Sequence, residues 1–372
     1  MRVGFSFHGL LADFEDHRFI TVDTPDGHRY GRTMLVKELL ARGHEVYILQ
    51  ERRGPLYEGV HYPLEDLAWK KGLDEHGHIR FDGTSCEFPA LDVIFMEYRW
   101  PTWKNDRSHP DHQPSRYEPD LDRQLEILKH YHGKVPIIVW DTDLKITPEF
   151  EKQWPEVIIA DPSFETNRLT RDRLSIPFWT DFKELILTAE PYPILGYVGN
   201  NYERNDEFQK YYFNLKQDAR IMGIQISMYG NWLQRSPERQ SPESLISNHR
   251  EVAFNHRMNF YDSMVMMNRF ICTTHVSKPR YYETGFMSPR YLEALAVNCP
   301  ALVPKAFKLN DILGKEWIVE KGSDVRDALG VFKNMTVAQR ADVVASQREN
   351  LKKVGRFDVK QTADLIESYA HC

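Results

Sequence analysis

Two carboxylates, one residue apart, follow an apolar run in the first half of the chain. Asp141 and Asp143 flank Thr142 directly after the run VPIIVW at 135–140. A carboxylate at the carboxyl end of a parallel strand is suited to act as a general base or as a metal ligand. An aspartate in the same place also forms an Asx turn or caps a helix. The sequence alone leaves both interpretations open.

A cation and an anion lie three residues apart in the apolar segment FMSPRYLEALAVNCPALVP, residues 286–304. Ser288 and Pro289 predict a helix start, with the serine as cap and the proline in the first helical position. Arg290 and Glu293 then occupy the first turn, where the helix N-terminus favours an anion. A diphosphate there would meet Arg290 and backbone amides, and Glu293 could accept hydrogen bonds from two ribose hydroxyls. The alternative is an ordinary i, i+3 salt bridge, which a helix buried by its apolar residues would keep only at a cost.

Glycine-bearing turns follow two apolar runs of the second half, in GYVGNNYER (196–204) and MYGN (228–231). Glycine lets backbone amides approach a phosphate, and Arg204 could add a charge-assisted contact. A plain solvated loop is the alternative. The sequence has no GxGxxG, GxxxxGK[ST], GxSxG or HExxH motif, so nicotinamide-binding, P-loop, serine-hydrolase and zincin classes are not supported.

Alternating strand and helix candidates must position these residues. Apolar runs predict strands at 2–7, 44–49, 91–97, 135–141, 157–163, 176–180, 193–200, 224–232, 268–275 and 300–304. Helical patterns occupy 30–42, 119–132, 207–223, 288–298, 324–335, 335–354 and 360–372. This alternation is typical of βαβ units in parallel sheets, where ligands bind at the carboxyl ends of the strands.

The bulk composition narrows the class of protein. A chain of 372 residues that is 41% hydrophobic predicts two domains rather than one. The net charge of -6 gives no sign of a polyanion binder, although an average can hide a basic groove. Four scattered cysteines without metal spacing indicate reduced thiols in a cytosolic protein. We find no apolar run long enough for a signal peptide or a membrane span, and expect a monomer in the cytoplasm, a host's if the chain is phage-encoded.

Taken in order along the chain, these motifs resemble those of GT-B-fold glycosyltransferases, and more narrowly the phage DNA β-glucosyltransferases. That family transfers glucose from UDP-glucose to hydroxymethylated cytosine. Its R-x-x-E helix matches Arg290 to Glu293, and its strand ending in Thr-Asp matches Thr142-Asp143. Its glycine-rich loop with phosphate-binding arginines resembles GYVGNNYER, although this chain has one arginine, Arg204, where the family has two. Its strand ending in F-G-N resembles YGN at 229–231.

The resemblance implies a role for each matched residue. Asp143 would be the catalytic base and Asp141 an additional catalytic carboxylate, linked to a Mg²⁺ or Mn²⁺ ion. The implied donor-binding residues are Arg290, Glu293, Arg204, Gly199, Gly230, Asn231 and, in a looser match, Gly9 after the first strand. The donor would be a nucleotide sugar, with UDP-glucose as the expected one.

The resemblance also implies an architecture. The GT-B fold has two Rossmann-like doubly wound α/β domains that face each other across a cleft. We expect an acceptor-side domain at 1–188, a nucleotide-sugar-binding domain at 189–355, and a C-terminal helix at 356–372 that packs back on the first domain.

The acceptor is left open by the sequence. An inverting transfer to a hydroxymethylated pyrimidine in duplex DNA needs a surface of cations and aromatics. The polar, proline-rich segment 104–120 and the residues before it offer such candidates: Arg99, Trp100, Trp103, Lys104, Arg107 and Arg116. Arg168, Arg171 and Arg173 form a second basic cluster. Two alternatives remain: the enzyme acts on a small-molecule or glycan acceptor, or the protein binds a nucleotide sugar without catalysis.

Overall fold

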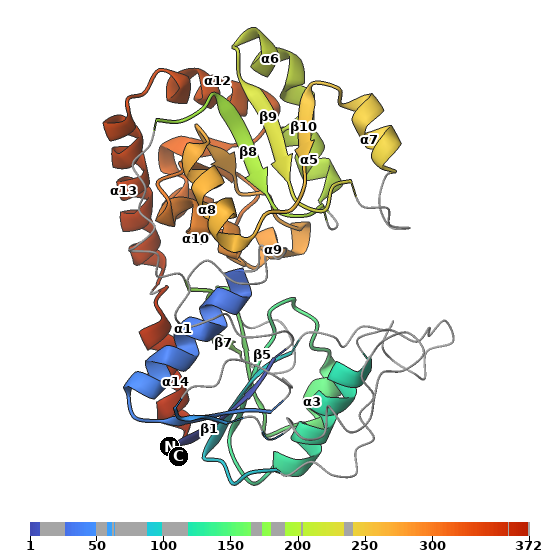
Figure 1. The fold of residues 1–372 in the computed structure, drawn as a ribbon, viewed down its shortest axis with the longest axis vertical. Helices are drawn as coiled ribbons and strands as arrows, with labels where there is room; N and C mark the ends of the chain where they lie inside the picture. The colour runs from blue at the N-terminus through green and yellow to red at the C-terminus, as the bar shows by residue number, and fades with distance from the viewer. Residues whose placement is uncertain are drawn as a thin grey trace. The chain divides into compact units, whose positions relative to one another are not determined.

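The chain folds into two units, each built on parallel β-strands (Figure 1). The structure is a computed structural model that describes residues 1–7, 27–49, 58–61, 63, 88–98, 118–164, 173–179, 190–201, 204–233, 241–355 and 357–370. Unit 1 contains the described residues of 1–15, 29–177 and 359–372, and unit 2 contains those of 16–28 and 178–358. The predicted α/β class is confirmed.

Unit 1 has a parallel sheet with the strand order β3-β2-β1-β4-β5-β6-β7. The strands are β1 (Arg2–Ser6), β2 (Glu45–Ile48), β3 (Val60–His61), β4 (Val93–Glu97), β5 (Ile137–Trp140), β6 (Ile158–Asp161) and β7 (Leu174–Ser175). Every residue of β4 and β5 is buried, which explains their nearly continuous apolar sequences. The strand order reverses between β1 and β4. In doubly wound sheets this reversal is where ligands bind.

The described helices of unit 1 are α1 (Gly27–Ala41), α3 (Glu118–Tyr131), α4 (Pro148–Gln153) and α14 (Val359–Ala370). The predicted stop after α1 is present, because Gly43 adopts a φ of +80° and its amide bonds to the Leu40 carbonyl. Helix α14 contacts strand β4. Arg42, just after α1, forms ion pairs of 2.8 Å with Asp364 and Glu367 of α14. The last described helix of the chain therefore belongs to unit 1.

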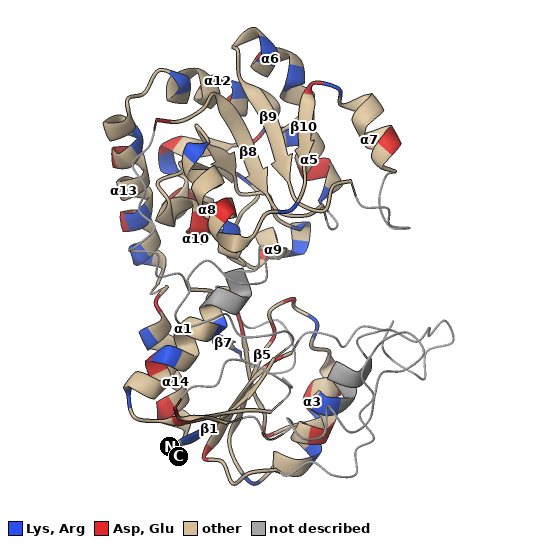
Figure 2. Cartoon of the chain, viewed as in Figure 1, with Lys and Arg blue, Asp and Glu red and all other residues tan. Residues whose placement is uncertain are grey.

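Unit 2 repeats the strand order of unit 1. Its strands are β8 (Ile194–Val198), β9 (Gln225–Tyr229), β10 (Val252–Asn255), β11 (Thr273–Thr274), β12 (Ala301–Pro304) and β13 (Ile318–Val319). They pair as β10-β9-β8 and β11-β12-β13, and a parallel bridge between Leu195 and Cys272 joins β8 to the β11 segment. Strands β8, β9 and β10 consist of uncharged residues (Figure 2). The order reverses between β8 and β11.

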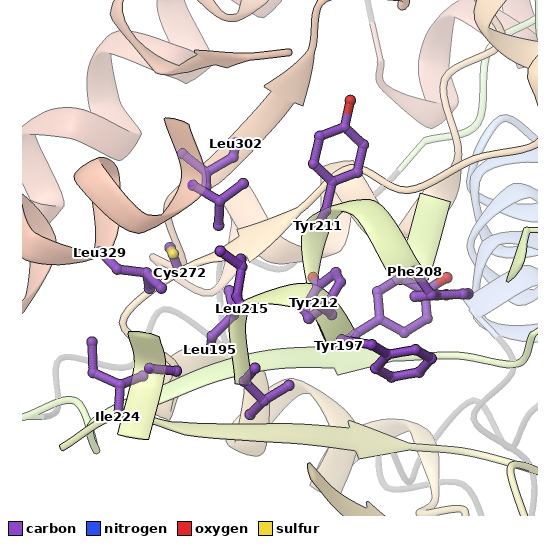
Figure 3. Packing of buried hydrophobic residues seen from close by; sticks show 14 of the residues in the cluster. Leu195, Tyr197, Phe208, Tyr211, Tyr212, Leu215, Ile224, Cys272, Leu302 and Leu329 are labelled. Carbon is purple, nitrogen blue, oxygen red and sulfur yellow. The ribbon is translucent and has the colours of Figure 1, made fainter. Parts of the chain in front are cut away.

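The helices of unit 2 are α5 (Asn205–Tyr211), α6 (Lys216–Ile221), α7 (Pro242–Asn248), α8 (Phe260–Arg269), α9 (Pro279–Glu283), α10 (Pro289–Ala296), α11 (Asn310–Leu313), α12 (Gly322–Lys333) and α13 (Val337–Val354), with 3₁₀ turns at Phe213–Leu215 and Lys315–Trp317. An aromatic core lies between the α5–α6 segment and strand β8, with Tyr197, Phe208 and Tyr212 close together (Figure 3). Gly196 of β8 has no side chain because the Phe270 ring takes that space: a Cβ atom would lie 2.4 Å from the ring.

Some predicted elements differ from the structure. The predicted helix 207–223 is broken into α5, a 3₁₀ turn and α6, because Tyr211, Tyr212 and Phe213 are all buried and one straight helix cannot turn three consecutive side chains to the same core. The predicted strand 176–180 is wrong: the strand there is β7, and after one hydrogen bond from the Ile176 amide to the Asp161 carbonyl, at 2.9 Å, residues 176–179 continue outside the strand. The predicted strand 268–275 is only two residues long, since α8 extends to Arg269.

Two further expectations concern the cysteines and membranes. Cys272 and Cys299 are buried free thiols, while Cys86 and Cys372 lie outside the described residues. Among the helices that the structure describes, none combines the length and the apolar character that crossing a membrane requires.

Candidate active site

A small cavity lies at the carboxyl ends of β8 and β11, where the strand order of unit 2 reverses. Its volume is about 10 Å³, which is room for roughly one water-sized group. Most of the residues that line it come from the β8 and β11 segments and from the start of α10, and α8 and β12 contribute Met267 and Ala301. They include Tyr197, Val198, Thr274, His275, Arg290 and Tyr291. The position agrees with the general rule for ligand sites in doubly wound sheets.

Arg290 and Glu293 lie in the first turn of α10, as predicted, with Pro289 in the first helical position. Ser288 has the extended conformation of a cap residue, but its side chain makes no capping hydrogen bond, so the predicted serine cap is wrong in that detail. The Arg290 guanidinium donates to the Glu293 carboxylate in an ion pair whose side chains are 21% and 2% exposed. The structure thus contains the salt bridge that was the alternative interpretation, and it also places Arg290 in the wall of the cavity.

The C-terminal end of α10 is held by Arg348 of α13. The Arg348 guanidinium donates to the carbonyls of Leu295 and Ala296, the latter at 3.1 Å, and to the Asn298 side chain at 3.0 Å. A cation at the C-terminus of a helix offsets its unpaired carbonyls and its dipole. Asn298 continues the chain with a φ of +58°, a conformation that asparagine tolerates better than most residues. These contacts fix α10 and therefore the position of Arg290.

Arg204 does not line the cavity itself, but it is hydrogen-bonded to two residues that do. Its guanidinium donates to the Tyr197 hydroxyl at 2.8 Å, to the Val276 carbonyl at 3.5 Å and to the Asn200 carbonyl. Tyr197 and Val276 both line the cavity. The two arginines singled out from the sequence, Arg204 and Arg290, are therefore associated with one site.

His275 is a residue of this site that sequence reasoning missed. Its side chain is 4% exposed, and neither ring nitrogen has a hydrogen-bond partner among the described residues. Tyr291 and Phe307 pack edge-to-face against the imidazole, with ring centroids 5.2 and 5.0 Å away. Burial and the nearby Arg204 lower the pKa of His275 to about 3, so the ring is neutral at ordinary pH. The one sequence feature that could have indicated His275 is its position directly after Thr273 and Thr274, which form strand β11.

The backbone amides of the glycine-bearing turns after β8 and β9 donate hydrogen bonds to other residues of unit 2. The Gly199 amide donates to the Tyr229 carbonyl at 2.8 Å, and the Asn231 amide donates to the Asn200 side chain at 2.7 Å. A Cβ atom on Gly230, whose φ is +150°, would lie 2.3 Å from the Gly199 carbonyl oxygen. Close approach of the two turns explains Gly230, and a φ of +145° with the Tyr197 side chain 3.0 Å from a Cβ atom explains Gly199. Neither glycine requires a ligand, so the predicted phosphate contact of their amides gains no support here.

In unit 1, Asp141 is buried at the end of β5, and polar groups surround its carboxylate. It accepts hydrogen bonds from the amides of Lys145 at 2.6 Å and Ile146 at 2.9 Å. Arg173 forms ion pairs of 3.2 Å with Asp141 and Asp161. Burial raises the pKa of Asp141, while the two amides and Arg173 oppose that shift. These contacts favour the turn-forming interpretation over a metal-bound carboxylate.

Asp143 lies in the turn that Asp141 organises, and its side chain is half-buried. The next residue, Leu144, has a φ of +56°, which is unusual for a leucine and is often found near functional sites. Thr142 donates to the carboxylate of Glu97 at 3.4 Å, and Glu97 forms a buried ion pair of 2.6 Å with Arg32. Glu97 ends strand β4, so a second carboxylate that the sequence did not single out lies beside the Thr142-Asp143 turn.

The predicted metal site was tested against the donor sets that the described residues form. They contain no group of three or more His, Cys, Asp or Glu side chains that could hold a metal ion. The Asp141 oxygens already have amide and guanidinium partners. The protein residues described here do not fit a resident Mg²⁺ or Mn²⁺ ion.

The acceptor-side candidates cannot be placed in the fold. Arg99, Trp100, Trp103, Lys104, Arg107 and Arg116 lie outside the described residues, as do Gly9, Arg168 and Arg171. Arg173 is described, and it is buried among the carboxylates of Asp141, Glu151 and Asp161. The expectation that Arg173 contributes to a basic surface is therefore wrong, because its charge is neutralised inside unit 1.

A second hollow of unit 2 is larger than the cavity beside α10. It has a volume of about 500 Å³ and is lined by α5, α6 and the start of α12. Its walls carry Asp206 and Asp218 as well as Lys210, Lys321 and Arg326, so charges of both signs alternate around it. It shares no lining residue with the cavity beside α10, and we do not assign it to the donor site.

Comparison with solved structures gives the fold class: the chain has the fold of GT-B glycosyltransferases, as predicted. No protein-family model matches the sequence, and no curated protein sequence matches it. The T4 phage β-glucosyltransferase, in complex with UDP and Mn²⁺, is similar over 100% of both chains, with a TM-score of 0.62 at 11% identity. An α-glucosyltransferase in complex with UDP-glucose and DNA containing an abasic site is similar over 99% of both chains, with a TM-score of 0.59 at 12% identity.

Proposed function

We propose that this protein is an inverting glycosyltransferase that moves a sugar, with UDP-glucose as the expected donor, onto the hydroxyl of a hydroxymethylated pyrimidine in DNA. The observation that carries the proposal is the association of Arg204 and Arg290 with one cavity at the strand-order reversal of unit 2. Two guanidinium groups at the carboxyl ends of parallel strands suit the diphosphate of a nucleotide sugar.

Glu293 supports the same assignment. Its carboxylate is buried and oriented by Arg290 one turn into α10, so it can accept hydrogen bonds from the vicinal hydroxyls of a ribose. Binding of a diphosphate would draw Arg290 towards the new anion and leave the carboxylate to the ribose. Gly199, Gly230, Asn231 and Gly9 stay secondary donor-binding candidates.

Asp143 is the proposed base. It takes the proton of the acceptor hydroxyl while that oxygen attacks the anomeric carbon of the sugar, and the bond from this carbon to the UDP oxygen breaks. The electron pair leaves with UDP, whose diphosphate Arg204 and Arg290 stabilise. Asp141 has a positioning role in this scheme, because its hydrogen bonds to Lys145 and Ile146 shape the turn that carries Asp143.

The DNA acceptor is supported by the likeness over nearly the whole chain to two glucosyltransferases, one from T4 phage and one described with DNA. The acceptor-binding candidates at 99–116 mix arginines, a lysine and tryptophans, which suits phosphates and an extruded base. The net charge of -6 favours a small-molecule or glycan acceptor instead, so the test includes both.

The test is a panel of nucleotide sugars supplied with duplex DNA that contains 5-hydroxymethylcytosine or 5-hydroxymethyluracil, followed by digestion and mass spectrometry of the nucleosides. We expect a nucleoside that gains one hexose with UDP-glucose, and no product with unmodified DNA. Gain of no sugar mass with any donor overturns the DNA acceptor. UDP release with a glycan or a small molecule would then identify the alternative, and no UDP release with any acceptor would leave only a nucleotide-sugar binder.

A further inference from the structure

Besides the Thr274 hydroxyl, two polar side chains in the wall of the unit 2 cavity lack the partners that buried polar groups normally have. The His275 ring nitrogens and the Tyr291 hydroxyl make no hydrogen bond to any residue that the structure describes. Both side chains are at least 96% buried. A buried polar group without a partner destabilises the folded protein, so such groups are rare unless a ligand or a water completes them.

These two groups belong to a single location. His275 and Tyr291 both line the cavity, and their rings pack edge-to-face. Arg290, the neighbour of Tyr291 in α10, lines it as well. The cavity of about 10 Å³ has room for one water-sized group and not for a sugar ring or a base. One ligand oxygen would fill it.

We propose that His275, together with the Tyr291 hydroxyl, donates hydrogen bonds to one diphosphate oxygen of a nucleoside diphosphate beside Arg290, and that His275 is a specificity-determining residue of the donor site. This inference rests on the proposed function, because it names a further residue of the same donor site. The diphosphate is preferred to a sugar hydroxyl because two arginines, Arg204 and Arg290, are associated with this cavity.

A neutral imidazole suits this position better than a third cation. A neutral ring carries one N–H donor and needs no proton from solvent. Arg204 and burial keep His275 neutral, so the ring adds a directional hydrogen bond without adding charge repulsion between the site's cations. Without the ligand, the same ring is an unpaired polar group among Tyr291 and Phe307.

This arrangement predicts opposite effects of one substitution on stability and on binding. In His275→Phe the ring keeps its edge-to-face packing and loses both nitrogens. Removing a buried polar group that has no partner is neutral or stabilising, so we expect an unfolding midpoint of the free variant equal to or above that of the wild type. We expect its affinity for UDP to fall by about 10- to 100-fold, because a hydrogen bond to a charged group is lost.

Two variants complete the set. His275→Gln keeps an N–H donor near the position of Nε2, and we expect it to recover part of the UDP affinity. His249→Phe is the matched control: His249 is also a buried histidine of unit 2, its ring stacks on Phe213 at 4.3 Å, and it does not line the cavity. This control should leave the affinity for UDP unchanged.

The measurement is isothermal titration of the full chain and its variants with UDP, UMP, uridine and UDP-glucose. Loss of UDP affinity in His275→Phe, with uridine binding unchanged, supports the proposal. Equal UDP affinity in wild type and His275→Phe overturns it, and loss for UDP-glucose alone overturns the diphosphate assignment in favour of a sugar hydroxyl. If His275→Phe binds UDP like the wild type but Arg290→Ala loses UDP binding, the donor site is correct and only the role of His275 is wrong. A wild-type chain that binds none of the four ligands overturns the donor assignment together with the inference.

Discussion

In unit 1 the buried carboxylate of Asp141 receives two backbone amides and the Arg173 guanidinium, whereas in unit 2 the buried imidazole of His275 receives no partner from the described residues. Each residue directly follows a strand, at the carboxyl edge of the parallel strands in its own unit. The sequence signals were similar in kind, a polar residue after an apolar run. Their hydrogen-bond partners differ completely.

The comparison separates two uses of a buried polar side chain. A group whose hydrogen bonds are completed inside the protein stabilises a turn, and a ligand can reach it only by breaking those bonds. A group left incomplete lowers the stability of the free protein and raises the gain when a ligand arrives. On this criterion Asp141 belongs to the scaffold and His275 belongs to the site.

The largest effect is expected for Asp143, the residue beside Asp141. Asp143→Asn should lower the rate of sugar transfer by about 10²- to 10⁴-fold, because a general base is lost, while the urea unfolding midpoint stays within error of the wild type. Steady-state transfer and urea unfolding measure the two quantities. If Asp143→Asn transfers sugar at the wild-type rate, the base lies elsewhere, and Glu97 is then the next carboxylate to replace.

Asp141→Asn should show the reverse pattern. One anionic partner of Arg173 is removed from a buried cluster, so we expect the free energy of unfolding to fall by about 3 kcal/mol. The measurement is urea denaturation, and Asp143→Asn, a substitution two positions away in the chain, is the matched control. An unchanged stability together with an altered dependence on Mn²⁺ would restore the metal interpretation of Asp141 and would break the comparison between the two units.

Glu293→Ala tests the donor side at a smaller magnitude. We expect affinity for UDP-glucose to fall by about tenfold, with a loss of about 1 kcal/mol or less in stability, since Arg290 keeps some contact with water when its partner is removed. Calorimetric titration and thermal unfolding give both numbers. Glu320→Ala, which breaks the exposed pair with Lys305, serves as control. Equal losses in affinity and stability would reduce the Arg290–Glu293 pair to an ordinary salt bridge.

The smallest effect on stability is expected for Glu367, whose partly exposed carboxylate pairs with Arg42 and His44. The hydrogen bond from His44, together with Arg42, lowers the pKa of Glu367. A carboxylate with a lowered folded pKa stabilises the protein above its unfolded pKa, and that stabilisation is lost as the pH falls through the folded value. Glu367→Gln should therefore cost about 0.5–1 kcal/mol at pH 7, and the cost should shrink towards zero in acid. Urea unfolding at a series of pH values checks it; a cost that persists in acid would point to packing instead of charge.

Much of the scaffold could be predicted from hydrophobic runs. Strands β1, β2, β4, β5, β6, β8, β9 and β12 and helices α1, α3 and α10 all lie within predicted ranges or differ from them by a few residues. Strands buried on both faces leave continuous apolar sequences, so this signal is local. Strands β3, β10 and β13 and helices α4, α7, α8, α9 and α11 were missed, because most of them are short and depend on tertiary contacts.

The site was predictable in part for the same reason. Arg290 and Glu293 carry a local signature, a proline-led helix start with charges one turn apart. His275 carries none, since its importance depends on partners that are missing in space and on Tyr291, sixteen positions later in the chain. Asp141 and Asp143 look alike in sequence, and only the amides of Lys145 and Ile146 distinguish them.

Helix α14 has a consequence for the synthesis of the protein. Val359, Thr362, Ala363 and Ile366 are buried, and the helix contacts β4 in the unit that the ribosome starts first. Domains tend to fold as their residues emerge. Unit 2 has all its described elements by residue 354, whereas unit 1, begun first, receives its final helix last. A nascent chain that stops before residue 359 would carry a finished second unit and a first unit with an uncovered apolar face, which a quality-control protease could recognise.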